Sequence, residues 1–268
     1  MAAHSFFVEP GAIQGERVEL RGPVAHQIRA VLRLGPGDLV DLLDNSGIAY
    51  TVRLVVVSRE SVVAEVVERR RPATEPRVEL RLYQALLKGQ KMDLVLQKGT
   101  EIGVSRFVPV LSERCVSRPS AADLRGRQGR WEAIVREAAE QSGRALMPVV
   151  EVLVPFAEAC KAASGDDLAI MAWEEERALG IGTVLREADL VGAVTPSPAP
   201  LPSKWDGVRR PRIALLVGPE GGFSPREAEI ARAAGVRVAT LGPRILRAET
   251  AALVAATLVL CETRDLGG

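Results

Sequence analysis

The stretch LLVGPEGGFSPRE, residues 215–227, runs an apolar segment into a glycine-rich loop and then into the start of a helix. Ser224, Pro225 and Glu227 predict the helix start, with Ser as N-cap, Pro in the first helical position and Glu closing a capping box. A helix capped in this way satisfies its own N–H groups, so we do not expect a phosphate at its N-terminus. The glycines of residues 218–222 therefore serve either a tight turn or the close approach of the backbone to a ligand.

A second loop of the same kind is LGPRILRAETAA, residues 241–252, which again follows an apolar segment and precedes a helix. Two such loops at the carboxyl ends of neighbouring parallel strands form the crevice in which open α/β sheets bind ligands. Neither loop contains the lysine of a P-loop or the GxGxxG of a dinucleotide site. Loops that expose backbone groups suit a neutral or zwitterionic ligand, such as an adenosine with an amino-acid tail.

The rest of the chain divides into two patterns. From residue 77 onward, strand-like and helix-like segments alternate, which predicts an α/β domain with a parallel sheet. The expected strands are residues 78–86, 106–111, 168–174, 212–218 and 236–242, and the expected helices are 92–103, 121–144, a helix from 224 and 250–264. The first 70 residues predict a small β-barrel with strands at 5–9, 16–21, 38–44, 49–58 and 61–70 and a short helix at 25–33.

The charged, proline-bearing stretch 69–76 predicts a domain boundary, which divides the chain into domains of residues 1–72 and 73–268. The proline-rich stretch 192–211 predicts a surface loop. Of the 268 residues, 47% are hydrophobic, which is enough for a sizeable core. Residues 73–150 carry 13 basic and 9 acidic side chains, whereas 151–268 carry 13 and 16, so a polyanion could bind the middle of the chain.

The cysteines, the histidines and the lengths of the apolar segments argue against several classes of protein. The three cysteines are widely spaced and predict buried free thiols rather than disulfides or a zinc site. His4 and His26 have no metal-ligand partner at a useful spacing, so we expect no metal. No apolar run approaches the roughly 20 residues of a membrane span, and residues 1–11 lack the features of a signal peptide. We expect a soluble, cytoplasmic protein.

The two glycine loops together closely resemble those of the SPOUT methyltransferases, and among these the RsmE type. The likeness continues through LLKGQKMDLVLQKGTEIGVSRFVPVLSERCVSR (86–118), RWEAIVREAAEQSGR (130–144) and HQIRAVLRLGPGD (26–38). The resemblance implies a C-terminal SPOUT α/β domain with a deep trefoil knot and a mainly parallel sheet, preceded by a small PUA-like β-barrel that binds RNA. It also implies a homodimer that uses S-adenosylmethionine to methylate N3 of a specific uridine in 16S ribosomal RNA, either naked or in the small ribosomal subunit.

The resemblance also implies where the cofactor binds, in three loops that follow strands. By position, the first loop contains MAWEE at residues 171–175, the second is residues 218–222 and the third is residues 241–246. The expected cofactor-binding residues are Trp173, Glu174, Leu216, Val217, Gly218, Glu220, Gly221, Gly222, Leu241, Gly242, Ile245 and Leu246. Glu220 meets the cofactor's amino group or pins its loop by accepting backbone hydrogen bonds, and we favour pinning.

Methylation of uridine N3 requires that a proton leave, which calls for a base or for stabilisation of the uracil anion. We expect Arg247 or Arg244 to stabilise the anionic uracil or a phosphate. Glu249 orients an arginine, accepts the proton, or is simply an acidic residue in the first turn of a helix. The candidate RNA contacts are basic residues: Arg29, Arg33, Lys88, Lys91, Lys98, Arg114 and Arg118.

Two other functions compete with this prediction. A ribosome-assembly factor would bind RNA through the barrel and use the second domain only to dimerise, but it would not need both glycine loops. A nicotinamide-linked oxidoreductase is excluded by the missing GxGxxG and the missing acidic residue for the ribose.

Overall fold

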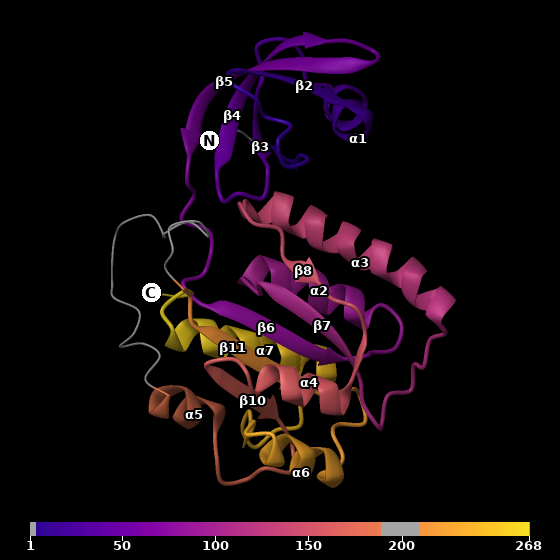
Figure 1. Cartoon of the computed structure of the whole chain (residues 1–268), viewed down its shortest axis with the longest axis vertical. Coiled ribbons are helices and arrows are strands. Elements are labelled where there is room, and N and C mark those ends of the chain that lie inside the picture. The colour runs from indigo at the N-terminus through magenta and orange to yellow at the C-terminus, as the bar shows by residue number, and fades with distance from the viewer. Residues whose placement is uncertain (1–3, 189–208, 268) are drawn as a thin grey trace. The chain divides into compact units, whose positions relative to one another are not determined.

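The structure, a computed structural model, describes residues 4–188 and 209–267, so the expected loop at 192–211 lies largely outside the described residues. The described chain forms two compact units (Figure 1). The first unit comprises residues 4–75 and 139–147, and the second comprises 76–138, 148–188 and 209–267. Segment 139–147 thus belongs to the first unit although it follows the start of the second in the chain.

The first unit is built on a five-stranded sheet with the order β1-β3-β4-β5-β2. β1 pairs with β3 in parallel, and the other pairs are antiparallel. Its elements are β1 (Ser5–Phe7), β2 (Arg17–Arg21), α1 (Gly22–His26), the π-helical turn η1 (Gln27–Val31), β3 (Leu39–Leu43), β4 (Ala49–Val57) and β5 (Ser61–Arg70). The predicted β-rich unit with one short helical segment is confirmed.

Phe6 and Phe7 show why segment 139–147 belongs to the first unit. Successive side chains of a strand point to opposite faces, yet both phenylalanines are buried. Phe6 packs in the main core with side chains such as Val40, and Phe7 packs on the other side in a cluster with Ala139 and Met147. The second face of this sheet is therefore covered by residues that lie far along the chain.

The second unit is built on a seven-stranded sheet, in which every pair is parallel. Its main strand order is β12-β10-β11-β6-β7-β8, and β9 also pairs with β7. The strands are β6 (Glu79–Ala85), β7 (Arg106–Leu111), β8 (Val149–Val150), β9 (Val154–Pro155), β10 (Leu168–Ala172), β11 (Arg212–Val217) and β12 (Arg237–Ala239). This confirms the α/β class with a parallel sheet.

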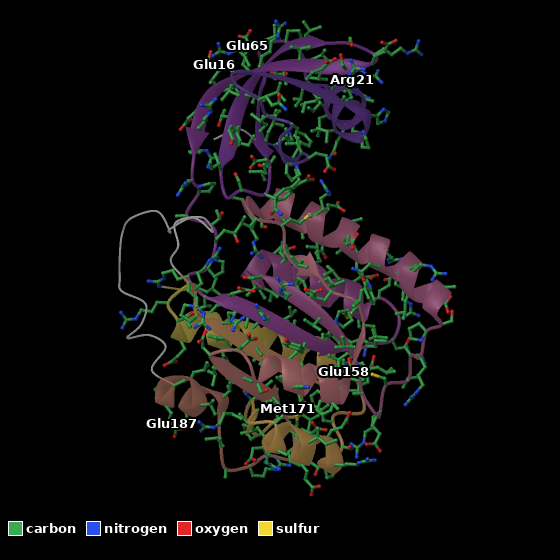
Figure 2. The ribbon with its side chains drawn as sticks, viewed as in Figure 1. Glu16, Arg21, Glu65, Glu158, Met171 and Glu187 are labelled. Atoms are coloured by element: carbon green, nitrogen blue, oxygen red, sulfur yellow. The ribbon has the colours of Figure 1, made fainter. Side chains whose placement is uncertain are left out.

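Helices cover the parallel sheet. The helices are α2 (Lys91–Ile102), α3 (Ala121–Ser142), α4 (Phe156–Ala163), α5 (Ile181–Glu187), α6 (Pro225–Ala233) and α7 (Ala248–Glu262). α7 packs on β6 and β11 with α2 and α5 beside it, and α4 and α6 pack together elsewhere, against β7 and β12 (Figure 1). Met171 of β10 is fully buried in this sheet, whereas Glu187 at the end of α5 is exposed (Figure 2). The sequence did not predict α4 and α5.

The predicted start of α6 is confirmed in detail. The Ser224 side chain accepts from the backbone N–H of Glu227, and the Glu227 side chain accepts from the backbone N–H of Ser224. Glu227 is buried, and its other oxygen accepts from the backbone N–H of Glu113. The cap thus also ties α6 to the segment after β7. The backbone N–H groups of Ser224 and Glu227 already donate within the cap.

One prediction about the cysteines is wrong. Cys115 and Cys160 are buried free thiols as expected, but Cys261 is exposed. It lies near the end of α7, whose sequence is apolar on nearly all sides and so does not indicate which face is buried. Burial raises the pKa of the Cys160 thiol to about 12, and the nearby Glu227 carboxylate adds to this.

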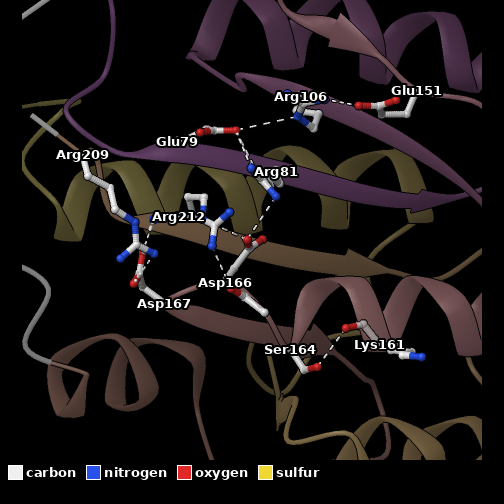
Figure 3. Close-up of polar contacts among 11 residues, drawn as sticks. Glu79, Arg81, Arg106, Glu151, Lys161, Ser164, Asp166, Asp167, Arg209 and Arg212 are labelled. Atoms are coloured by element: carbon white, nitrogen blue, oxygen red, sulfur yellow. Dashed lines mark hydrogen bonds and ion pairs between the residues drawn. The ribbon is translucent and has the colours of Figure 1, made fainter. Parts of the chain in front are cut away.

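The amino ends of the parallel strands carry a cluster of ion pairs (Figure 3). Asp166, which is 1% exposed and precedes β10, lies 3.1 Å from Arg81 of β6 and 3.3 Å from Arg212 of β11. Arg81 also pairs with Glu79. A further pair joins Arg106 to Glu151. Burial raises the pKa of Asp166, although the two arginines oppose the shift. The guanidiniums at this end of the sheet therefore have carboxylate partners.

Candidate functional site

Three strands end at the same level at the carboxyl-terminal edge of the parallel sheet, opposite the ion pairs at the amino ends of the strands. Ala172, the last residue of β10, is in register with Val217 of β11 on one side and with Ala239 of β12 on the other. The expectation that the two glycine loops follow neighbouring strands is wrong, because β10 lies between β11 and β12. The loop after β10 therefore lies between the other two, and all three loops begin at one edge.

These loops surround a cavity of about 220 Å³. Its lining comes from the loops after β10, β11 and β12, from the first residue of α2 and from the first turn of α7. The lining residues are Lys91, Ala172, Trp173, Glu174, Arg177, Val217, Gly218, Pro219, Glu220, Gly222, Thr240, Leu241, Gly242, Pro243, Arg244, Ile245, Leu246, Arg247, Ala248 and Ala251. Ile245 is 82% exposed, which places it at the mouth of the cavity.

Most of the residues expected to bind the cofactor line this cavity, and two do not. Leu216 is buried within β11, and Gly221 packs against Arg114, with 3.2 Å between an ideal Cβ at Gly221 and the Arg114 Cβ. Glu249 is also absent from the lining, although Arg244 and Arg247 belong to it. Arg177 and Thr240 also line the cavity and were not expected there, although their positions shortly after the ends of β10 and β12 indicate it.

Gly222 is the most tightly constrained residue of the glycine loop. Its φ is +67°, which L side chains rarely adopt, and a Cβ there would overlap the Glu174 carboxylate and lie 2.7 Å from its Cδ. A Cβ at Gly218 would lie 3.2 Å from the carbonyl carbon of Gly222, which belongs to the same loop. Gly222 therefore allows the loops after β10 and β11 to approach each other closely, and Gly218 allows the loop after β11 to fold tightly on itself.

Replacing Gly222 by alanine is expected to weaken S-adenosylmethionine binding about tenfold. The αL conformation costs an L residue about 1–2 kcal/mol, and the overlap with Glu174 adds to it, so the loop moves away from the cavity. Calorimetric titration of the purified protein with the cofactor measures this. Gly180→Ala is the control, because Gly180 has φ −79° and no atom within 4 Å of its Cβ position. Wild-type affinity in Gly222→Ala would contradict the prediction.

The loop after β10 is held by Glu176 and Arg232. The Glu176 carboxylate accepts the backbone N–H groups of Arg177, Ala178 and Leu179 and pairs with Arg232 of α6 at 2.9 Å. The hydrogen bond from Ala178 leads the contacts that lower the pKa of Glu176. Arg232 also lies over the Trp173 ring, 5.4 Å from its centroid. The Trp173 indole N–H donates to the Phe223 carbonyl, which joins this loop to the glycine loop.

Lys91 joins two glutamates at the edge of the cavity. Its Nζ lies 3.4 Å from Glu220 Oε1 and 3.4 Å from Glu249 Oε2. Glu220 also accepts the backbone N–H of Lys88, which is a pinning contact of the favoured kind. Partial burial opposes ionisation of Glu220, but the hydrogen bond from Lys88 and the charge of Lys91 outweigh it and lower its pKa. Among the described residues, the buried Glu249 Oε2 has no hydrogen-bond partner besides this ion pair.

Of the seven residues expected to contact RNA, two lie in the first unit and five in the second. Arg29 lies in η1, and Arg33 follows it with a φ of +54°. Lys88 and Lys91 contact Glu220, as described above. The other three have partners within the second unit: Lys98 pairs with Glu101, Arg114 donates to the carbonyls of Gly221 and Phe223, and Arg118 donates to the carbonyl of Glu113. Lys88, Lys91 and Arg114 therefore converge on the glycine loop.

Within residues 4–188 and 209–267, no helix is long and apolar enough to cross a membrane. The same residues contain no group of three His, Cys, Asp or Glu side chains that could hold a metal ion.

Comparisons with known proteins agree with this geometry. The family described as the RNA methyltransferase domain matches residues 74–260, and the RNA methyltransferase PUA domain matches residues 20–67. The chain is 30% identical to ribosomal RNA small subunit methyltransferase E of Bacillus subtilis, over 93% of this chain and 91% of the relative. It is 32% identical to the Synechocystis enzyme of the same name, over 94% of this chain and 76% of the relative.

A solved structure shows the same fold over nearly the whole length. The ribosomal RNA small subunit methyltransferase E of Neisseria gonorrhoeae, in complex with S-adenosylmethionine, superposes with a TM-score of 0.79 at 31% identity. The match covers 96% of this chain and 97% of the Neisseria chain. The expected fold class, a PUA-like unit followed by a SPOUT α/β domain, is confirmed. By its sequence, its fold and the loops around its cavity, this chain belongs to the RNA methyltransferases of the ribosomal RNA small subunit methyltransferase E family.

Proposed function

We propose that this protein transfers the methyl group of S-adenosylmethionine to N3 of a specific uridine in 16S ribosomal RNA. The observation that carries the proposal is the cavity at the sheet edge, where three loops with Gly218, Gly222 and Gly242 in its wall meet. The Neisseria relative, which is bound to S-adenosylmethionine, supports the choice of cofactor. Residues 1–72 bind the RNA, residues 73–268 carry the reaction and form the homodimer, and the protein acts in the cytoplasm.

The lining residues fit such a cofactor. Gly222 and Gly242 both have positive φ, and nothing lies within 4 Å of a Cβ at Gly242, so a ligand can approach the backbone there. The side chains of Leu241, Ile245 and Leu246 offer apolar contacts to an adenosine. When bound, the cofactor supplies a methyl group on a positively charged sulfur. The chain's own task is to align the uridine with that methyl group and to exclude water.

The residues beside the cavity supply the acid–base chemistry. We assign to Arg247 the stabilisation of the negative charge that develops on the uracil as its N3 proton leaves, with Arg244 as a second contact. We assign the proton to Glu249. Among the described residues, its carboxylate pairs with Lys91 and not with an arginine, which favours the role of proton acceptor over that of orienting an arginine. The glutamate lies in the first turn of α7 and is largely buried, with 13% of its side chain exposed.

The reaction product tests the proposal. Small ribosomal subunits from cells that lack this protein are incubated with the purified protein and S-adenosylmethionine, and the RNA is digested to nucleosides for mass spectrometry. The expected product is N3-methyluridine from a single position. A methyl group on another atom or base would contradict the proposed target, and absence of any methylated nucleoside despite cofactor binding would contradict the enzymatic role.

A further inference from the structure

Arginines in the second unit differ sharply between the two ends of the parallel sheet. At the amino ends, Arg81, Arg106 and Arg212 all pair with carboxylates. At the opposite edge, three arginines, Arg177, Arg244 and Arg247, line the cavity, and within residues 4–188 and 209–267 no carboxylate pairs with their guanidinium groups. All three are exposed. Arg244 and Arg247 already have a proposed role, but Arg177 has none.

Within the described residues, none of the acidic side chains near Arg177 forms an ion pair with it, and Glu175 in the same loop is itself exposed. Glu176 accepts three backbone N–H groups and pairs with Arg232, and so its carboxylate is already used. The Glu174 carboxylate lies against Gly222. Glu220, the other carboxylate of the lining, pairs with Lys91. Of the described side chains that line the cavity, four are cationic and two are anionic, which leaves a local excess of positive charge.

The loop that carries Arg177 is held in place, although no described residue pairs with the Arg177 guanidinium. Arg177 donates its own backbone N–H to Glu176, and the same carboxylate binds Arg232 of α6. Trp173, at the start of the loop, is fixed by its bond to the Phe223 carbonyl at 3.1 Å. A guanidinium on a fixed backbone needs little ordering of the loop before it binds an anion, and arginine suits phosphate because it can donate two parallel hydrogen bonds.

We propose that Arg177 is a substrate-binding residue that binds a backbone phosphate of the RNA next to the target nucleotide, at the mouth of the methyl-transfer cavity. The inference rests on the proposed function and deepens it, because it assigns a contact to RNA that the cofactor does not need. A phosphate is favoured over the cofactor's carboxylate because Arg177, Arg244 and Arg247 together exceed the charge of one carboxylate, whereas an RNA backbone brings one negative charge with every nucleotide. The side chain acts on RNA binding and touches none of the reacting atoms.

The test compares Arg177→Ala, Arg177→Gln and Arg177→Lys in the full-length protein with Arg226→Ala as the control. Arg226 is also exposed and lies in α6, away from the cavity lining. Affinity for unmethylated small subunits is measured as a function of salt concentration, and cofactor affinity is measured separately by calorimetry. We expect Arg177→Ala and Arg177→Gln to bind the subunits about tenfold more weakly, because a hydrogen bond from a charged group is lost. The slope of log K against log salt should fall by about 0.7–0.9.

Arg177→Lys should retain part of the affinity and the full salt slope, because it keeps the charge but loses the paired hydrogen bonds. In every variant the cofactor affinity should stay within about twofold of the wild-type value. A change of that size is too small to indicate a lost contact. Weaker cofactor binding with unchanged subunit binding would overturn the proposal and assign Arg177 to the cofactor's carboxylate. Unchanged values in both assays would also overturn it. If the wild-type protein bound no cofactor at all, the proposed function would fail, while the subunit assay would still decide on Arg177.

Discussion

Arg247→Ala and Glu249→Gln are each expected to lower the turnover number about hundredfold, because each removes a group that acts only as the uracil loses its proton. Arg247 is the N-cap residue of α7, but its side chain makes no capping hydrogen bond, so its removal leaves the helix start intact. Glu249→Gln keeps the shape of the side chain and removes its ability to accept a proton. Turnover is measured with saturating subunits and cofactor, so that weakened binding does not contribute.

One control for this pair lies in the same helix, α7, and the other lies in α6. Glu262→Gln changes the last residue of α7, which lies outside the cavity lining, and Arg226→Ala changes an exposed arginine of α6. Both should keep wild-type turnover. Cofactor affinity should stay within about twofold in Arg247→Ala and Glu249→Gln, since neither is assigned to ground-state cofactor binding. Unchanged turnover in both would remove these two residues from the mechanism.

Asp166→Ala is expected to lower the free energy of unfolding by about 3 kcal/mol at neutral pH. Removing one partner of a buried ion pair leaves the other charge uncompensated, which typically costs about 3–5 kcal/mol. Asp166 is 1% exposed, whereas Arg81 and Arg212 expose 18% and 32% of their side chains, so the lower end of that range applies. Urea unfolding followed by circular dichroism measures the change.

Two further variants separate this effect from a general loss of charge. Glu187→Ala breaks the ion pair between Glu187, whose side chain is 53% exposed, and Arg237, whose side chain is 42% exposed. It should change the free energy of unfolding by less than about 1 kcal/mol. Asp166→Ala combined with Arg212→Met should recover part of the loss, because one uncompensated guanidinium is removed with its partner. If Asp166→Ala and Glu187→Ala lowered the free energy of unfolding equally, the burial of Asp166 would not explain the effect of its removal.

The raised pKa of Asp166 gives this cluster a pH dependence. A carboxyl whose pKa is raised by folding binds its proton more tightly in the folded state, so its contribution to stability is largest at low pH. That contribution declines as the pH rises through the ordinary value of 3.8 toward the raised value of the folded protein. The ionised cluster is therefore costly to break and yet not a strong net source of stability, as expected for buried charges.

Local signals in the sequence predicted local structure well. Ser224 and Glu227 predicted the start of α6 because a capping box involves residues only three apart. The alternation of elements predicted a parallel sheet, and the glycine loops predicted which residues would meet at its edge. α4 was missed because its short sequence, rich in alanine, offers no clear start signal; the structure gives its N-cap Pro155 no side-chain hydrogen bond.

Contacts between distant segments could not be read in this way. Nothing near Lys91 indicates that it will lie between Glu220 and Glu249, since that contact requires β6, β11 and α7 to be assembled first. The position of β10 between β11 and β12 is likewise a property of the whole sheet. The exposure of Cys261 depends on which side of the apolar α7 faces the sheet, and packing alone decides that.

The cluster of Phe7, Leu43 and Ala49 with Ala139 and Met147 has a consequence for synthesis on the ribosome. The ribosome makes the chain from the N-terminus onward. The apolar side chains of Phe7, Leu43 and Ala49 therefore stay exposed until residue 147 has left the ribosome. The first unit can therefore not finish folding as its own sequence is completed, and it stays open while the first strands of the second unit are being made. Over that interval the exposed apolar side chains make the nascent chain prone to aggregation.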